Sequence, residues 1–330
     1  MTTGLSSPSE SEKPEGEPAA QPLPAKKYRA SIYPVDEEID QSFASLIIEL
    51  EEIVGYKIWV LIQGRDETDW GMIGPQVCQG FRAQKAAIIA NEKVGLLIDS
   101  AGGQARSAYE IVRLFQRRTP HFSTLVPLFA KSAATLLAIG GREIVMGIEA
   151  ELGPLDVQIY DQDRDEWDSA LNSVQSFERL NAYALMAYDQ AMMLFSSRTG
   201  KRPHVLMPYA LQYATSIVGP MADKIDTFEV TAKARELKVA EDYAVRIMRP
   251  YYPQALASRI ARNLVERYSS HSFVIDRTEA GPPTPDSAFG LGLNIAKISA
   301  PIENVFTRLA PYLSDSVTTP VIGRIMEVSP

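Results

Sequence analysis

Two short segments of the chain combine small residues with a hydroxyl group in a pattern that suits nucleophilic chemistry. The apolar run from Val94 to Ile98 predicts a buried strand, and the glycine pair Gly102 and Gly103 follows it closely. One strand further on, Ser132 lies in the first turn of a predicted helix from Ala130 to Gly141. A serine at a helix start beside a glycine turn can attack a carbonyl group while backbone N–H groups hold the oxyanion. The two segments therefore predict a serine nucleophile.

Strands and helices alternate around these segments. Apolar runs typical of strands lie at Lys57 to Gln63 and at Phe122 to Phe129, on either side of the Val94 run. Apolar residues recur at helical spacing from Pro75 to Asn91 and from Gln104 to Arg118. A strand, a helix and a second strand in this order form a right-handed unit with parallel strands. The pattern therefore predicts an α/β core around a mostly parallel sheet.

Three motifs, taken together, resemble one family of serine peptidases. Asp99-Ser100-Ala101-Gly102-Gly103 resembles the Asn-Ser-Pro-Gly-Gly motif of the class that contains the Clp protease and the SppA signal-peptide peptidase. Ala130-Lys131-Ser132-Ala133-Ala134-Thr135-Leu136 resembles the nucleophile segment of its serine dehydrogenase proteinase branch. Leu152-Gly153-Pro154-Leu155-Asp156-Val157-Gln158 resembles the Leu-Gly-Pro-Ile-Asp-Pro-Gln run of that branch.

This resemblance implies a ClpP/crotonase-like spiral of βαβ units and the activity of a serine endopeptidase-like hydrolase. Ser132 takes the place of the nucleophile, and the N–H groups of Gly102, Gly103 and Ala133 take that of the oxyanion hole. The substrate that it implies is a peptide or a protein, with no cofactor. A serine dehydrogenase in the literal sense is not expected, because no Gly-x-Gly-x-x-Gly motif follows a strand.

The general base does not follow from the motifs. No histidine lies between Ser132 and Lys201, so the histidine of a Clp-type triad is missing there, and Lys201 is too far along for the lysine of SppA. Lys131 is adjacent to the serine and points in a different direction. His271 is the best candidate, because a comparable Ser/Thr-His stretch occurs in the resembling branch. Asp156 is the candidate for orienting the base.

Three regions differ in composition. Residues 1–27 contain almost no large apolar side chains and are expected to form a disordered tail. Residues 28–160 form the expected α/β core. Residues 161–330 are expected to be mainly helical, with helices at roughly 169–198, 205–217, 221–248 and 253–268. In the resembling class such helices cap the site and pack between subunits, so we expect a homo-oligomer.

Charge and composition narrow the possible partners. The formal net charge of −8 gives no electrostatic reason to expect nucleic-acid binding. The chain has one cysteine and no Cys/His cluster with the spacing of metal ligands, so no metal site is expected. No run of about eighteen apolar residues predicts a membrane-spanning helix, and no signal peptide is evident. A cytoplasmic location fits these observations.

The sequence therefore favours a serine peptidase in which Ser132 attacks a peptide carbonyl. The base is His271 or another group, from the same chain or from a neighbouring subunit. Two other functions stay open. An acyl-CoA enzyme of the crotonase-like fold would use the same N–H groups to hold a thioester enolate. A non-catalytic pseudo-peptidase scaffold would explain why the histidine and lysine of the related enzymes are missing at their usual places.

Overall fold

A six-stranded mixed sheet forms the centre of the protein. The computed structural model describes residues 26–64, 68–156, 158–161, 166–284 and 289–328. The strand order is β1-β11-β2-β3-β4-β6. The bounds are β1 (Lys27–Ala30), β2 (Lys57–Ile62), β3 (Val94–Asp99), β4 (Phe122–Val126), β6 (Ile144–Met146) and β11 (Val321–Val328). Strands β2, β3, β4 and β6 are parallel, whereas β11 runs antiparallel to both of its neighbours.

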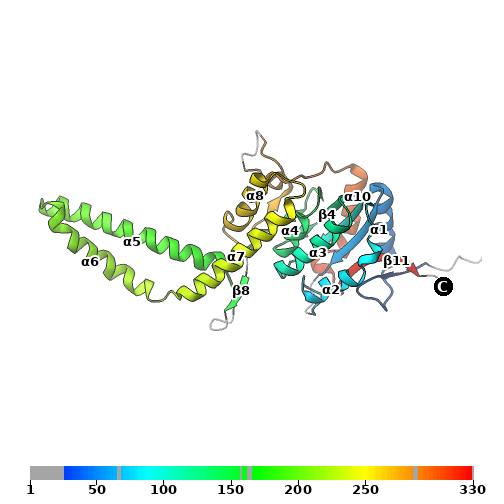
Figure 1. Ribbon diagram of the computed structural model, residues 1–330, viewed down its shortest axis with the longest axis horizontal. Helices are drawn as coiled ribbons and strands as arrows, with labels where there is room; N and C mark the ends of the chain where they lie inside the picture. The colour runs from blue at the N-terminus through cyan, green and yellow to red at the C-terminus, as the bar shows by residue number, and fades with distance from the viewer. Residues whose placement is uncertain (1–25, 65–67, 157, 162–165, 285–288, 329–330) are drawn as a thin grey trace, which may run out of the picture.

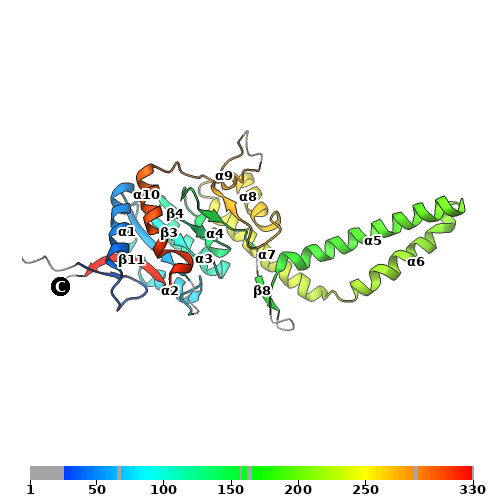
Figure 2. The same cartoon turned by 180° about the vertical axis from the view of Figure 1, so that it is seen from behind.

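Helices cover both faces of this sheet (Figures 1 and 2). The helices of the core are α1 (Gln41–Val54), α2 (Pro75–Ala83), α3 (Ala105–Arg118), α4 (Ala133–Ala138) and α10 (Ala300–Leu309). Side chains of β3 alternate between the two faces: Leu96 and Ile98 pack with α2, α3 and α4, while Leu97 packs with α1 and α10. Since both faces of the strands are buried, they form continuous apolar runs, as the sequence predicted.

A second, smaller sheet lies beside the ends of the central strands. Its order is β10-β7-β5, with β5 (Phe129–Ala130), β7 (Glu151–Leu152) and β10 (Ile275–Asp276). Strands β5 and β7 are parallel, and β10 is antiparallel to β7. On the far side of β5, Ser100 accepts the N–H of Lys131 and donates its own N–H to the carbonyl of Phe129. The small sheet therefore joins the glycine turn, the serine segment and the region around residue 275.

Helices dominate the chain from residue 170 to residue 266. They are α5 (Ala170–Thr199), α6 (Pro203–Ala222), α7 (Thr227–Met248) and α8 (Gln254–Glu266). Helices α5 and α6 form a long hairpin that extends away from the body of the protein (Figures 1 and 2). Helices α7 and α8 instead pack against the body. Pro203 stands in the first turn of α6, where a missing N–H has no cost. The remaining short elements are β8 (Gln158–Asp161), β9 (Glu166–Ser169), α9 (Arg277–Ala280) and single 3-10 turns.

The structure confirms the α/β class and most predicted elements, and two predicted helices differ in their bounds. The helix predicted over Pro75 to Asn91 ends at Ala83 and is followed by a 3-10 turn, Lys85–Ala87, in which the Lys85 carbonyl accepts the N–H of Ile88 as well as the Arg118 side chain. The helix predicted from Ala130 begins only at Ala133, because Ala130 is paired in β5. The sheet is mostly parallel, as predicted: three of its five strand pairings are parallel, and the two pairings of β11 are antiparallel.

The expected division at residue 160 also changes. Within the region 161–330, which was expected to be helical, β11 inserts into the central sheet between β1 and β2, and α10 covers one face of it. The chain end therefore completes the core. The expected tail, 1–27, lies outside the described residues except for Lys26 and Lys27, and Lys27 begins β1.

A substitution at Phe115 tests how much the apolar core contributes to stability. Its fully buried ring stacks on Phe122 with centroids 4.8 Å apart and meets the edges of Trp59 and Phe81. Because the cavity would be lined by rigid rings, we expect Phe115→Ala to lower the free energy of unfolding by about 3–5 kcal/mol. Urea unfolding measures this, with Ile148→Ala as the control. Ile148 is exposed, so its change stays within about 0.5 kcal/mol.

Candidate active site

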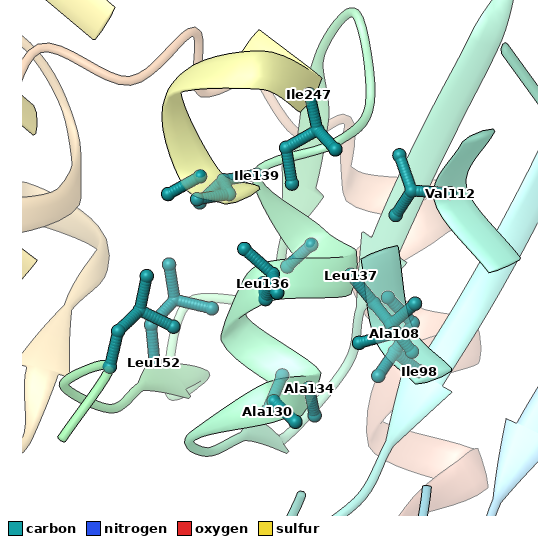
Figure 3. Close-up of a cluster of buried hydrophobic side chains, with 14 of the residues drawn as sticks. Ile98, Ala108, Val112, Ala130, Ala134, Leu136, Leu137, Ile139, Leu152 and Ile247 are labelled. Carbon is teal, nitrogen blue, oxygen red and sulfur yellow. The ribbon is translucent and has the colours of Figure 1, made fainter. Parts of the chain in front are cut away.

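Ser132 has an unusual backbone conformation at the start of α4. Its φ of 50° and ψ of −121° lie outside the backbone regions that residues with a Cβ normally adopt. Such a conformation costs about 1–3 kcal/mol and persists only where the surroundings enforce it. Those surroundings are apolar: every residue of α4 is buried, and its side chains pack against β3, α3 and α7 (Figure 3). Ser132 itself is only partly buried.

The glycine pair packs against two segments: Gly102 lies against the serine segment and Gly103 against Ile73. A Cβ built on Gly102 would come within 2.7 Å of the Lys131 carbonyl oxygen and 2.9 Å of the Ser132 Cβ. A Cβ on Gly103 would come within 2.5 Å of the Ile73 carbonyl oxygen. Both glycines also have positive φ, 115° and 142°. Only glycine therefore allows residue 102 to approach Ser132, and residue 103 to approach Ile73, so closely.

A buried polar network holds the turn in place. The Ser100 hydroxyl donates to Gln63 Oε1 at 2.6 Å, and Gln63 Nε2 donates to the carbonyl of Trp70 at 2.7 Å. The N–H of Gly102 donates to Ser100 Oγ at 3.0 Å. At the end of β3, the fully buried Asp99 accepts the N–H of Ser314 at 2.6 Å. The first polar residues of the motif therefore shape the turn and connect it to the C-terminal segment.

Two of the backbone N–H groups nominated from the sequence are available to a ligand. Within the described part of the chain, neither Gly103 nor Ala133 donates its N–H in a hydrogen bond. The N–H of Gly102, which the resemblance assigns to the oxyanion hole, is instead engaged with Ser100. Of the three N–H groups nominated from the sequence, the geometry therefore leaves Gly103 and Ala133 as donors for an oxyanion.

The small sheet brings three distant segments to one edge. Ser132 follows β5 by two residues, and Asp156 follows the parallel strand β7 by four. His271 precedes β10 by four residues, and β10 runs antiparallel to β7. The ends of parallel strands and the start of an antiparallel one lie at the same edge of a sheet. Ser132, Asp156 and His271 therefore emerge on the same side.

His271 and Asp156 form a pair at this edge. His271 Nδ1 lies 4.0 Å from Asp156 Oδ2, and the two side chains are 25% and 5% exposed. Within the described residues, the buried Nδ1 atom has no hydrogen-bond partner. A hydrogen bond between Leu155 N–H and the carbonyl of Leu264 ties the Asp156 turn to α8, from which the His271 segment follows. The distance is longer than a hydrogen bond, as is common in sites without substrate.

Lys131, the neighbour of the serine, ties the three segments together. Its Nζ atom forms an ion pair with Glu151 at 2.7 Å and lies 3.3 Å and 3.4 Å from the carbonyl oxygens of Leu152 and Phe273. These three acceptors match the three donors of an ammonium group. These contacts direct the Lys131 side chain toward the β7 and β10 segments, so we assign it the role of a positioning residue.

Thr135 is a site residue for which no role was predicted from the sequence. Its buried Oγ1 lies 2.7 Å from the carbonyl oxygen of Ala130 and accepts the N–H of Gly153 at 3.0 Å. This hydroxyl fixes α4 relative to both β5 and the turn after β7. The only signal in the sequence was a polar residue among apolar ones in α4, which a buried hydrogen bond explains.

Other reactive groups differ from Ser132 in their surroundings. Burial and the neighbouring Glu110 raise the pKa of the Cys78 thiol to about 11, so it stays neutral and weakly nucleophilic at neutral pH. Burial and the carboxylate of Glu279 also raise the pKa of Tyr268.

No group of three or more His, Cys, Asp or Glu side chains that could hold a metal occurs within the described ranges. Across those same ranges no helix is long and apolar enough to cross a membrane.

Comparison with known proteins gives one limited match. No family model matches the chain. A stretch of 79 residues is 32% identical to an uncharacterized protein of Methanocaldococcus jannaschii. The stretch covers 24% of this chain and 27% of the archaeal protein, so about a quarter of that relative is matched. The functional conclusion therefore depends on the geometry of the site.

The contact of Gly102 with the serine gives the first test of the site. In Gly102→Ala the methyl group would clash with the Lys131 carbonyl at a positive φ, so the turn must shift. We expect a loss of stability of about 1–3 kcal/mol, measured by urea unfolding. Gly74→Ala is the control, because the nearest atom to its Cβ is 3.9 Å away and its φ is −129°. A Gly102→Ala protein as stable as Gly74→Ala would contradict the close approach.

Lys131 gives the second test. Lys131→Met keeps the length of the side chain but leaves Glu151 and two carbonyl groups without their donor. We expect a cost of about 1–3 kcal/mol in the free energy of unfolding. Lys57→Met removes a similar but exposed ion pair, with Glu51, and is expected to cost at most about 1 kcal/mol. Equal costs in the two variants would show that Lys131 does not hold the segments together.

Proposed function

We propose that the protein is a serine hydrolase that cleaves peptide bonds, with Ser132 as nucleophile and His271 as general base. The observation that supports this most strongly is the pair of His271 and Asp156 at the edge where Ser132 emerges. These three residues come from segments far apart in the chain. A serine nucleophile, a histidine base and an acidic residue that orients the histidine are the parts of a catalytic triad.

In the proposed reaction, each residue has one task. Ser132 Oγ attacks the substrate carbonyl carbon and transfers its proton to His271. The N–H groups of Gly103 and Ala133 donate to the oxygen that becomes negative. His271 then returns the proton to the leaving amine as the C–N bond breaks, and a water molecule cleaves the acyl-enzyme by the same steps in reverse. Each oxyanion donor contributes about 2.7–4 kcal/mol to lowering the barrier.

Asp156 is assigned the role of orienting the base. A nearly buried carboxylate beside one ring nitrogen favours the tautomer that leaves the other nitrogen free to accept a proton. It also stabilises the imidazolium that forms during the reaction.

The order of the motifs and their geometry together support the proposed class of enzyme. The proposed fold is a ClpP/crotonase-like spiral. In this fold a glycine turn after one central strand faces the start of the helix that follows the neighbouring strand. Here the turn after β3 contacts the residue before α4 in this way. The motif after β7 is tied to the same helix through Thr135. These contacts support a peptidase of the serine dehydrogenase proteinase type.

Labelling with a fluorophosphonate probe tests the proposal. Intact-mass spectrometry of the wild type should show one adduct, and Ser132→Ala should show none. His271→Ala should slow labelling by about 10²–10⁴-fold, because the general base is lost. Asp156→Asn should slow it less. Ser270→Ala is the matched control, since this exposed serine is next to His271 and its hydroxyl bonds to Ser272.

The outcomes separate the alternatives. Adduct formation that persists in Ser132→Ala would overturn the assignment of the nucleophile. A folded protein that forms no adduct would favour either a non-catalytic scaffold or an acyl-CoA enzyme. Isothermal titration with coenzyme A then distinguishes these two, because only the acyl-CoA enzyme is expected to bind it. Thermal unfolding of every variant shows that the losses are not due to misfolding.

A further inference from the structure

Three arginine side chains gather where α3 meets the end of α7, two helices that pack against each other (Figure 1). Arg113 lies in α3, Arg246 in the last turn of α7 and Arg249 directly after it. Together with Tyr109 and Pro250 they line an open pocket of about 440 Å³, which we call the arginine pocket. A pocket of this size can hold a small ligand.

The arginines of the pocket lack carboxylate partners. Within the described part of the chain, none of the three forms a salt bridge. The nearest carboxylates along the two helices are engaged elsewhere: Glu110 pairs with Arg82 at 2.6 Å, and Asp242 pairs with Lys238 at 3.4 Å. Asp242 precedes Arg246 by one helical turn and still does not pair with it. Cations that share a pocket repel one another, so a bound anion would be favourable.

A fourth arginine lies near Tyr251, which directly follows the pocket residue Pro250. Burial raises the pKa of Tyr251, and the positive charges of Arg142 and Arg113 oppose this rise. Both arginines therefore lie close to the tyrosine. The Nη1 atom of Arg142 is 3.3 Å from His121 Nδ1, and no carboxylate pairs with Arg142 among the residues that the structure describes. The Tyr251 hydroxyl is protonated at neutral pH and can donate to an anion.

Two contacts join the helices that carry the pocket. The rings of Tyr109 in α3 and Tyr243 in α7 stack with centroids 4.4 Å apart. Gln116 Nε2 donates to the carbonyl oxygen of Ile247 in α7 at 2.7 Å. The Oε1 atom of the same glutamine accepts from Arg113 Nη1 at 3.0 Å, which orients the guanidinium group. Arg113 is thus held in place before a ligand binds, and this lowers the entropic cost of binding.

The helix dipole accounts for only part of the cluster. Arg246 and Arg249 lie at the C-terminal end of α7, where cations are favoured. Arg113 lies in the body of α3, and Arg142 lies just before β6. The dipole of α7 therefore does not explain why arginines from two other segments occur at the same place.

The chemistry of the pocket suits a chain of phosphate groups. The planar guanidinium fork can donate two parallel hydrogen bonds to phosphate oxygens. A terminal phosphate group carries a charge of about −1.5 to −2 at neutral pH. Several guanidinium groups therefore match two or more phosphate groups better than one carboxylate. The formal charge of −8 on the whole chain disfavours a long polyanion such as a nucleic acid.

We propose that the arginine pocket binds a small molecule with a chain of two or more phosphate groups. Arg113, Arg246 and Arg249 donate to the phosphate oxygens, and Arg142 adds to the positive potential. The Tyr251 hydroxyl is a further donor. This proposal does not depend on the catalytic one, because none of these residues takes part in the candidate active site.

Isothermal titration of the full chain with sodium triphosphate, at low salt and without metal ions, tests the proposal. The wild type should bind one equivalent, and the dissociation constant should rise severalfold when the salt concentration is increased, because screening weakens the attraction. Arg113→Gln, Arg246→Gln and Arg249→Gln should each raise the dissociation constant by at least about tenfold, because each removes charge-assisted hydrogen bonds. Arg113→Lys should recover only part of the affinity, since lysine keeps the charge but not the fork.

The matched control is Arg262→Gln. Arg262 is an exposed arginine of α8 outside the pocket, so its loss changes the net charge equally. Its dissociation constant should stay within about twofold of the wild type. Thermal unfolding without ligand shows whether each variant is folded. Triphosphate should raise the unfolding temperature of the wild type and leave that of the double variant Arg246→Gln and Arg249→Gln unchanged.

A comparison of inorganic triphosphate with adenosine triphosphate distinguishes two sources of the phosphate chain. Equal affinities would show that the pocket recognises the phosphate chain alone, and tighter binding of adenosine triphosphate would identify a nucleotide. Both results support the proposal. Coenzyme A also carries phosphate groups, so its titration in the test of the catalytic proposal is done with the double variant Arg246→Gln and Arg249→Gln.

Three results would overturn the proposal. One is a wild type that binds neither triphosphate nor adenosine triphosphate at concentrations up to about 1 mM. The second is a dissociation constant that rises no more in the Arg246→Gln and Arg249→Gln variant than in Arg262→Gln. The third is binding of a single-stranded oligonucleotide without any binding of triphosphate, which would assign the cluster to nucleic acid instead.

Discussion

The close approach of Gly102 to Ser132 is the contact on which the proposed chemistry depends. It places a glycine backbone against a serine whose own φ is positive, at the point where two strands of different sheets end. A side chain at residue 102 would separate the turn from the helix. The apolar layer around α4 and the hydrogen bonds of Thr135 supply the rigidity that holds Ser132 in this costly conformation. The packing therefore determines the backbone conformation at Ser132, and this conformation in turn determines where the serine hydroxyl lies.

The residue next to the nucleophile has a structural task that also limits the chemistry. Lys131 holds the segments of β5, β7 and β10 together through an ion pair and two carbonyl groups. The three contacts of Lys131 are all structural, which distinguishes this site from one that uses a serine and a lysine. In the proposed reaction the base is therefore His271, which the same small sheet brings beside Asp156.

The sequence predicted local features better than long-range ones. Ser132 and the glycine pair could be identified because the glycines, the buried strand and the helix start are adjacent in the chain. His271 and Asp156 were nominated separately, but their pairing depends on strands of two residues, which are too short to give a periodic signal. Strand β11 was missed because Gly323 and Arg324 interrupt its apolar pattern. Helices α5 and α6 were predicted well, since Gly200 and Pro203 mark the turn between them.

The measurement that tests the central claim most directly is a crystal structure of the protein after reaction with a fluorophosphonate. The account predicts phosphorus bonded to Ser132 Oγ, with one phosphonyl oxygen about 3 Å from both the Gly103 and the Ala133 nitrogen atoms. It also predicts the imidazole of His271 beside the adduct, with Asp156 at hydrogen-bonding distance. An adduct whose oxygen points away from these two N–H groups, or one on another residue, would contradict the account.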